Sequence, residues 1–188
     1  SGITSVDKHG YAYINFMTPQ NYYTVVKGGK TNTTFFRHIH YVVSNSTNTI
    51  WNDSIMTTLV VRDYMYRELI TSLNVGNAII INTLPCTMYA KDHIPNTYNL
   101  PYNIIGLKNK IPKDALYKWF NGLIEMHYPK IRSLLVKKKL SLYEIPIICY
   151  CAHSKCNAST IAMRKLMKMG FVNVSHFSGG MQLFNSKK

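Results

Sequence analysis

Two short runs of almost wholly apolar residues constrain the fold of this chain more than any other feature of its sequence. They occupy residues 78–81 and 145–150, and neither alternates between apolar and polar side chains. A strand of this kind is buried on both faces, as in a parallel sheet that helices cover on both sides. The two runs therefore predict a mostly parallel central sheet.

The segments between and after these runs have apolar residues at helical spacing. We expect helices over residues 64–73, 113–126, 129–140 and 157–169, and one more short strand at residues 172–174. Strands that alternate with helices in this way are typical of an α/β domain with flanking helices. We expect this domain to span residues 58–188.

The first 57 residues have a different pattern. Runs rich in aromatic and β-branched residues, which favour strands, cover residues 11–16, 22–26 and 35–43, with turn-forming residues between them. We therefore expect residues 1–57 to form a small β-rich N-terminal extension. We also expect it to pack on the α/β domain, because its aromatic side chains would otherwise face water.

The charge balance of the chain is strongly basic. Lys and Arg total 22 against 8 Asp and Glu, which gives a formal net charge of +14. Such a charge favours small anionic substrates, and it also suits a nucleic acid or an acidic protein as a partner. No apolar stretch reaches the ~18 residues that a membrane-spanning helix needs, and the start of the chain has no secretion-signal pattern. We therefore expect no association with a membrane.

Three of the four cysteines, Cys149, Cys151 and Cys156, lie within eight residues of one another. A secreted protein that depends on disulfides spreads its cysteines along the chain to close long loops. The cluster instead indicates thiol chemistry in a reducing, intracellular compartment, and we expect the cytoplasm.

Cys151 has the most informative position, because it directly follows the apolar run 145–150 and a short polar loop separates it from the next predicted helix. Parallel sheets place their sites at the carboxyl ends of the strands. The N–H groups of such a loop and of the helix N-terminus would stabilise a thiolate or a bound anion there. We therefore predict that Cys151 is a functional thiol at this site. The predicted anion-binding loop consists of Ala152, His153, Ser154, Lys155, Cys156 and Asn157.

The sequence indicates no metal ion and no cofactor. A zinc site is disfavoured, because Cys149 and Cys151 are two residues apart on a predicted strand rather than on a turn. A phosphatase of the Cys-x5-Arg type is strongly disfavoured, since Asn157 stands where the phosphate-binding arginine is needed. The remaining structural alternative is that Cys151 is only a small buried residue at the end of a strand.

Three segments of the chain resemble the family of rhodanese-like domains. They are residues 150–159 with the helix that follows, residues 173–181 with their double glycine, and residues 89–101 with the sequence His93-Ile-Pro. The resemblance extends over roughly residues 58–184. It implies a rhodanese fold and a sulfurtransferase activity. Cys151, which corresponds to the family's nucleophile, would take sulfane sulfur from thiosulfate or a persulfide donor and pass it to a thiol or to cyanide.

The chain departs from the family pattern in two places. Asn82 and Thr83 stand where many members have Asp and Arg, at the end of the first central strand. Cys156 stands where an arginine is common, five residues after the nucleophile, so the loop is of the variant Cys-x4-Cys type. The resemblance then implies that anion binding falls to Lys155, to backbone N–H groups and to Arg164.

Two other functions stay open. One is a non-catalytic rhodanese-like module that binds nucleic acid or protein through a basic surface. The other is a thiol redox protein in which Cys156 acts as the resolving thiol and forms a disulfide with an oxidised Cys151.

Overall fold

The computed structural model describes residues 2–17, 19, 22–25, 32–35, 37–45, 47–105 and 111–188, with the backbone alone at 22–25 and 32–35. The chain divides into two compact units, Ser1–Val60 and Val61–Lys188. The domain boundary expected from the sequence, between residues 57 and 58, falls within a strand of the first unit, Met56–Leu59. In the part of the chain that is described, no helix is long and apolar enough to cross a membrane.

The N-terminal unit contains two antiparallel strand pairs within its described residues. β1 (Tyr22–Val25) pairs with β2 (Asn32–Phe35), and β3 (His38–Tyr41) pairs with β4 (Met56–Leu59). The β-rich character predicted for this part of the chain is therefore confirmed. The last residue of the predicted run 22–26 lies outside the described residues.

Two strand predictions in this unit are wrong in detail. Residues 11–16 form no strand, and their aromatic side chains are exposed, with Tyr13 at 79%. Alternating aromatic residues form a strand only where a partner supplies the backbone hydrogen bonds, and this segment has none among the described strands. The predicted run 35–43 is also divided, because β2 ends at Phe35 and β3 begins at His38.

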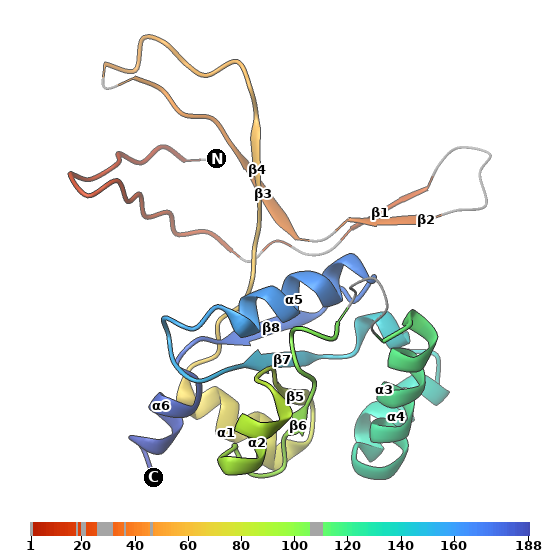
Figure 1. Cartoon of the computed structure of the whole chain (residues 1–188). Helices are drawn as coiled ribbons and strands as arrows, with labels where there is room; N and C mark the ends of the chain where they lie inside the picture. The colour runs from red at the N-terminus through yellow and green to blue at the C-terminus, as the bar shows by residue number, and fades with distance from the viewer. Residues whose placement is uncertain are drawn as a thin grey trace. The chain divides into compact units, whose positions relative to one another are not determined.

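The C-terminal unit is built on a sheet of four parallel strands, which confirms the predicted α/β architecture (Figure 1). The strands lie in the order β6 (Tyr98–Asn99), β5 (Ile79–Asn82), β7 (Ile147–Tyr150) and β8 (Val174–Phe177). Every residue of β5 and β7 is buried, as expected for apolar runs in the middle of a covered sheet.

Six α-helices and one 3₁₀ turn lie in the described part of this unit. They are α1 (Tyr66–Val75), α2 (Cys86–Lys91), α3 (Lys113–His127), α4 (Pro129–Val136), η1 (Leu142–Glu144), α5 (Ala158–Lys168) and α6 (Gly180–Asn185). The four helices predicted by periodicity are α1, α3, α4 and α5. The sequence did not predict α2, α6 or β6, because six residues or fewer are too short to show a period. The strand expected at 172–174 in fact spans Val174–Phe177.

The two faces of the sheet carry different helices. A cluster of buried side chains on one face joins Ile148, Tyr150 and Phe177 to Leu69 of α1 and Phe184 of α6. Helix α5 packs on β7 and β8 from the opposite face, and Figure 1 shows the sheet between α5 and α1. Since side chains alternate along a strand, neighbouring residues of β7 and β8 belong to different layers of the core.

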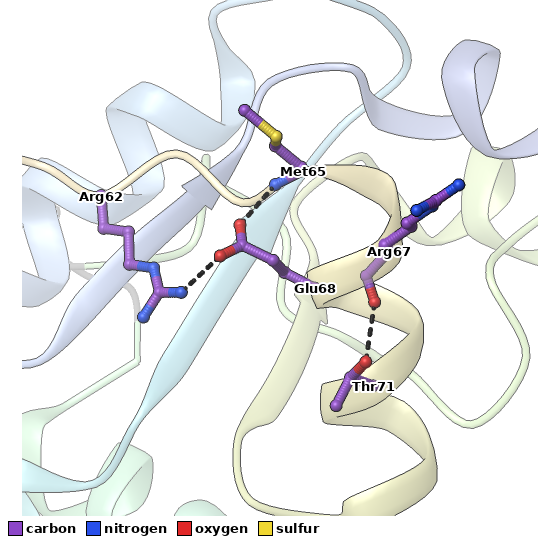
Figure 2. Close-up of polar contacts among 5 residues, drawn as sticks. All are labelled: Arg62, Met65, Arg67, Glu68 and Thr71. Atoms are coloured by element: carbon purple, nitrogen blue, oxygen red, sulfur yellow. Dashed lines mark hydrogen bonds and ion pairs between the residues drawn. The ribbon is translucent and has the colours of Figure 1, made fainter.

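The N-terminus of α1 is fixed by one carboxylate, as Figure 2 shows. Glu68 accepts a hydrogen bond from the N–H of Met65 at 2.9 Å and forms an ion pair with Arg62 at 2.7 Å. The Met65 N–H first, and then Arg62, lower the pKa of this carboxyl. One turn later Thr71 Oγ1 donates to the carbonyl of Arg67. These contacts order residues 62–65, which run beside β8 before the helix begins.

Candidate functional site

The candidate site is built where β7 ends. Cys151 is the first residue after the strand and is 1% exposed. Residues 151–157 form a loop, closed by a hydrogen bond from the N–H of Cys156 to the carbonyl of His153 at 2.9 Å, and α5 begins at Ala158. The structure therefore has the strand, loop and helix that were predicted around this cysteine.

Helix α6 braces this loop from its other side. The N–H groups of Met181 and Gln182 donate to the carbonyls of Cys151 and Ala152 at 3.0 and 2.9 Å. Gly180 permits this approach, because its φ of +56° lies in the left-handed region and a Cβ there would collide with the carbonyl of Cys151. The double-glycine turn thus positions the backbone of the cysteine loop.

The end of β5 supports the same loop through neutral groups. Thr83 donates to the carbonyl of Tyr150 from its N–H and from its hydroxyl, each at 3.0 Å. Asn82 Oδ1 accepts from the N–H of Leu84 at 2.9 Å, while Asn82 Nδ2 is buried without a hydrogen-bond partner in the described chain. Asn82 and Thr83 therefore hold the strand end through contacts with backbone groups.

The sulfur of Cys151 lies among polar partners although it is buried. It lies 3.2 Å from the carbonyl of Cys156, to which the thiol can donate, and 3.1 Å from Ser159 Oγ. Ser159 is in the first turn of α5 and is fully buried. Ser159 Oγ in turn lies 2.7 Å from His176 Nε2 on β8. Thiol, hydroxyl and imidazole therefore form one continuous hydrogen-bonded chain.

The two loop thiols differ in acidity. Burial raises the pKa of Cys151, and this outweighs the lowering by the hydroxyl and N–H of Ser159. Burial also acts on Cys156, but the N–H of Ala158, the Cys151 thiol and the N–H of Ala152 outweigh it and lower its pKa. The expectation that loop N–H groups favour a thiolate thus applies to Cys156. For Cys151 the N–H and hydroxyl of Ser159 act in the expected direction, but burial and the neighbouring Cys156 thiol outweigh them.

His176, at the end of this chain of hydrogen bonds, favours its neutral form. Burial lowers the pKa of His176, and the negative charge of Asp63 opposes that shift. Cys149, in register with His176 on the neighbouring strand, has its pKa raised to about 12 by burial. The groups beneath the loop are therefore uncharged near neutral pH, which keeps the buried layer free of fixed charge.

The other predicted loop residues lie toward the solvent. The side chains of His153, Ser154, Lys155 and Asn157 are exposed, and those of Ala152 and Cys156 are half-buried. Arg164 is exposed in the middle of α5, more than one turn beyond the loop. Among the described residues, no group of three or more His, Cys, Asp or Glu side chains could hold a metal ion.

Sequence reasoning did not assign a site role to Ser159 or His176. Their relation to Cys151 depends on the register of β8 against β7, which puts His176 opposite Cys149, and on the rotation of α5 about its axis. The available signal was a histidine two residues after the predicted strand 172–174, within the segment 173–181.

The chain is similar in fold to several solved structures. Human single-domain sulfurtransferase TSTD1 matches at 16% identity with a TM-score of 0.47, over 69% of this chain and 99% of that one. The single-domain sulfurtransferase RDL2 of Saccharomyces cerevisiae matches at 16% with a TM-score of 0.49, over 70% and 94%. The BH2092 protein of Bacillus halodurans matches at 23% with a TM-score of 0.46, over 67% and 72%.

A search of curated proteins finds no match to this chain. The family model described as "Rhodanese-like domain" matches residues 65–187, which is well over half of the sequence. These residues include the strand, loop and helix around Cys151 and the double-glycine turn. The resemblance noted in the sequence is thereby confirmed, and the chain belongs to the family of rhodanese-like domains.

Proposed function

We propose that this protein is a sulfurtransferase that carries sulfane sulfur as a persulfide on Cys151. The observation that carries the proposal is the position of Cys151. It heads the loop at the carboxyl end of the central strand β7, in a chain that belongs to the rhodanese-like family. In an open α/β sheet this edge is where ligands bind.

The reaction has two displacement steps. The Cys151 thiolate attacks the sulfane sulfur of a donor such as thiosulfate, a new S–S bond forms, and sulfite leaves with the electron pair of the broken S–S bond. A thiolate or cyanide then attacks the outer sulfur, and Cys151 leaves as a thiolate. Sulfur moves from donor to acceptor, and the protein returns to its starting state.

An anionic donor suits the surroundings of this thiol. Lys155 lies exposed on the loop that Cys151 heads, and the whole chain carries a net charge of +14. Positive groups near a site raise the local concentration of small anions. We therefore propose thiosulfate or a small persulfide as donor, and a thiol as acceptor.

Cys156 supports a second candidate function, a thiol redox cycle. The pKa of Cys156 is lowered, and the Cys156 thiol raises the pKa of Cys151, so the two thiols interact as a nucleophile and a resolving thiol would. The Cys156 thiolate would attack the inner sulfur of a Cys151 persulfide, form a Cys151–Cys156 disulfide and release hydrosulfide. An external thiol would then have to reduce that disulfide before the next cycle.

A turnover assay tests the first proposal. Wild-type protein incubated with thiosulfate and cyanide should form thiocyanate and sulfite in equal amounts. Cys151→Ser should form neither, because a hydroxyl at this position is a far weaker nucleophile than a thiolate. The matched control is Cys86→Ser, which removes an exposed cysteine on α2 and should retain the wild-type rate. Equal rates for Cys151→Ser and wild type would overturn the proposal.

A further inference from the structure

The chain of hydrogen bonds beneath the cysteine loop joins three separate elements of the fold. Cys151 follows β7, Ser159 lies in the first turn of α5, and His176 lies on β8. The links measure 3.1 Å from sulfur to hydroxyl and 2.7 Å from hydroxyl to imidazole. Both are within hydrogen-bonding distance, and a hydroxyl between them can accept a proton on one side while it donates on the other.

We propose that Ser159 and His176 form a proton relay, which takes the proton of the Cys151 thiol before sulfur transfer and returns it afterwards. The inference rests on the proposed function, because it assigns the proton steps of the same thiol. Ser159 touches the reacting sulfur and is the catalytic member of the pair. His176 acts through Ser159 and is a positioning residue that holds the proton.

The relay works because the same two hydrogen bonds suit both charge states. In the resting state, the neutral imidazole has its hydrogen on Nδ1, so Nε2 accepts from the Ser159 hydroxyl. After ionisation the polarity reverses, because Nε2–H now donates to Ser159 Oγ and the serine hydroxyl donates to the thiolate. No side chain has to move for this change.

The proton steps balance without an outside reagent. The S–H bond of Cys151 and the O–H bond of Ser159 break, while a new O–H forms on Ser159 and an N–H forms on His176 Nε2. The products are a thiolate and an imidazolium, and no electrons are exchanged. When an acceptor removes the sulfur, Cys151 leaves as a thiolate and the imidazolium returns the proton along the same path.

The buried position of Cys151 explains why such a relay is needed. Burial raises the pKa of this thiol, and the cationic side chain of the loop, Lys155, is exposed to solvent. A thiol in this environment is mostly protonated near neutral pH, and it becomes nucleophilic only when a neighbouring base accepts its proton.

The groups that face His176 allow its imidazole both to gain and to lose a proton. Asp63 lies on the neighbouring segment and opposes the effect of burial on the pKa of His176, so it would stabilise the imidazolium. On β7, Cys149 stays neutral because burial raises its pKa to about 12. From α5 the facing group is Ser159, and the carbonyl of Arg62 accepts the backbone N–H of His176 at 2.8 Å.

The test is the pH profile of single-turnover persulfide formation from thiosulfate, in wild type, His176→Gln and Ser159→Ala. General-base assistance of this kind contributes at least about 100-fold. We expect each variant to lose about 100-fold at pH 7 and to approach the wild-type rate at pH values where the thiol ionises without help. The double variant should be no slower than either single variant, since both changes break one relay.

The matched control is His127→Gln, which removes an exposed histidine on α3 and should leave the whole profile unchanged. A wild-type profile for His176→Gln would overturn the relay. So would a loss that is equally large at every pH, because that is the result of a purely structural role.

A second readout separates failure of the relay from failure of the proposed function. The rate at which iodoacetamide alkylates Cys151 reports its thiolate and needs no sulfur donor. We expect the pH midpoint of alkylation to be higher in His176→Gln than in wild type. This shift would support the relay even if wild type took up no sulfur from thiosulfate. The absence of sulfur uptake would overturn only the sulfurtransferase proposal. Equal midpoints in both proteins would overturn the relay.

Discussion

The two faces of the central sheet use the same strands for different purposes. Toward α1 and α6, β7 and β8 present Ile148, Tyr150 and Phe177 to an apolar cluster. Toward α5, the next residues along the same strands include Cys149 and His176, and the polar chain from Cys151 ends there. The face toward α1 and α6 thus carries an apolar cluster, and the other face holds the polar groups that we propose relay a proton. A strand can serve both purposes because its side chains alternate.

The largest effect on stability should come from the apolar face. Leu69 of α1 is fully buried in the cluster, and Leu69→Ala leaves a cavity as well as removing apolar contacts. We expect the free energy of unfolding to fall by about 3 kcal/mol, measured by urea denaturation. The transfer rate per folded molecule should stay at the wild-type value.

The reciprocal variant on the α5 face is Ser159→Ala. It should slow transfer strongly while it lowers the free energy of unfolding by less than Leu69→Ala does. The comparison between the faces would be broken if Leu69→Ala slowed transfer in folded protein as much as Ser159→Ala.

Tyr150 is the one polar contribution of β7 to the apolar face, and it offers a smaller test. Its hydroxyl accepts from the N–H of Ile94 at 3.1 Å and lies 2.8 Å from Thr97 Oγ1, both in buried surroundings. Tyr150→Phe leaves these partners without their bond, at a cost of about 1–2 kcal/mol. Thermal or urea unfolding would measure the change. A variant as stable as wild type would show that the hydroxyl contributes nothing to this face.

The smallest expected effect is the pH dependence of stability that His176 contributes. Burial lowers the pKa of His176 in the folded state, so the unfolded chain binds the proton more readily. Stability from this group is therefore complete well above the unfolded pKa of about 6.5 and is lost as the pH falls below it. The slope cannot exceed about 1.4 kcal/mol per pH unit for one proton.

The control for this effect is His176→Gln, which cannot titrate. Between pH 7 and pH 5, wild type should lose more unfolding free energy than this variant in parallel urea titrations. Identical losses would mean that His176 has the same pKa in both states, and the α5 face would then be no different from the apolar face in its response to acid.

The parts of the fold that could be predicted from sequence are those where burial determines the residue types. The runs that became β5 and β7 had to be apolar on both faces, and the helical period of α3 and α5 reflects one buried side each. The strand predicted at residues 11–16 was wrong, since an aromatic run indicates a strand only when another strand pairs with it.

The candidate site was predictable to the same degree. Cys151 could be located because its position depends on the local order of strand, loop and helix. The contact between Ser159 and His176 could not, because it joins residues 17 positions apart through a strand register that the sequence does not encode locally. The acidity of the two thiols was also out of reach. It depends on which of them the helix N–H groups contact and on how deeply each is buried.

The central claim is that Cys151 carries the sulfur, and the intact mass of the protein after incubation with thiosulfate tests it most directly. Wild type should gain about 32 Da, the mass of one sulfur bound to a thiolate nucleophile. Cys156→Ser should gain the same mass, and Cys151→Ser should gain none. An adduct that persists in Cys151→Ser and disappears in Cys156→Ser would contradict the account and assign the sulfur to the more acidic, less buried thiol.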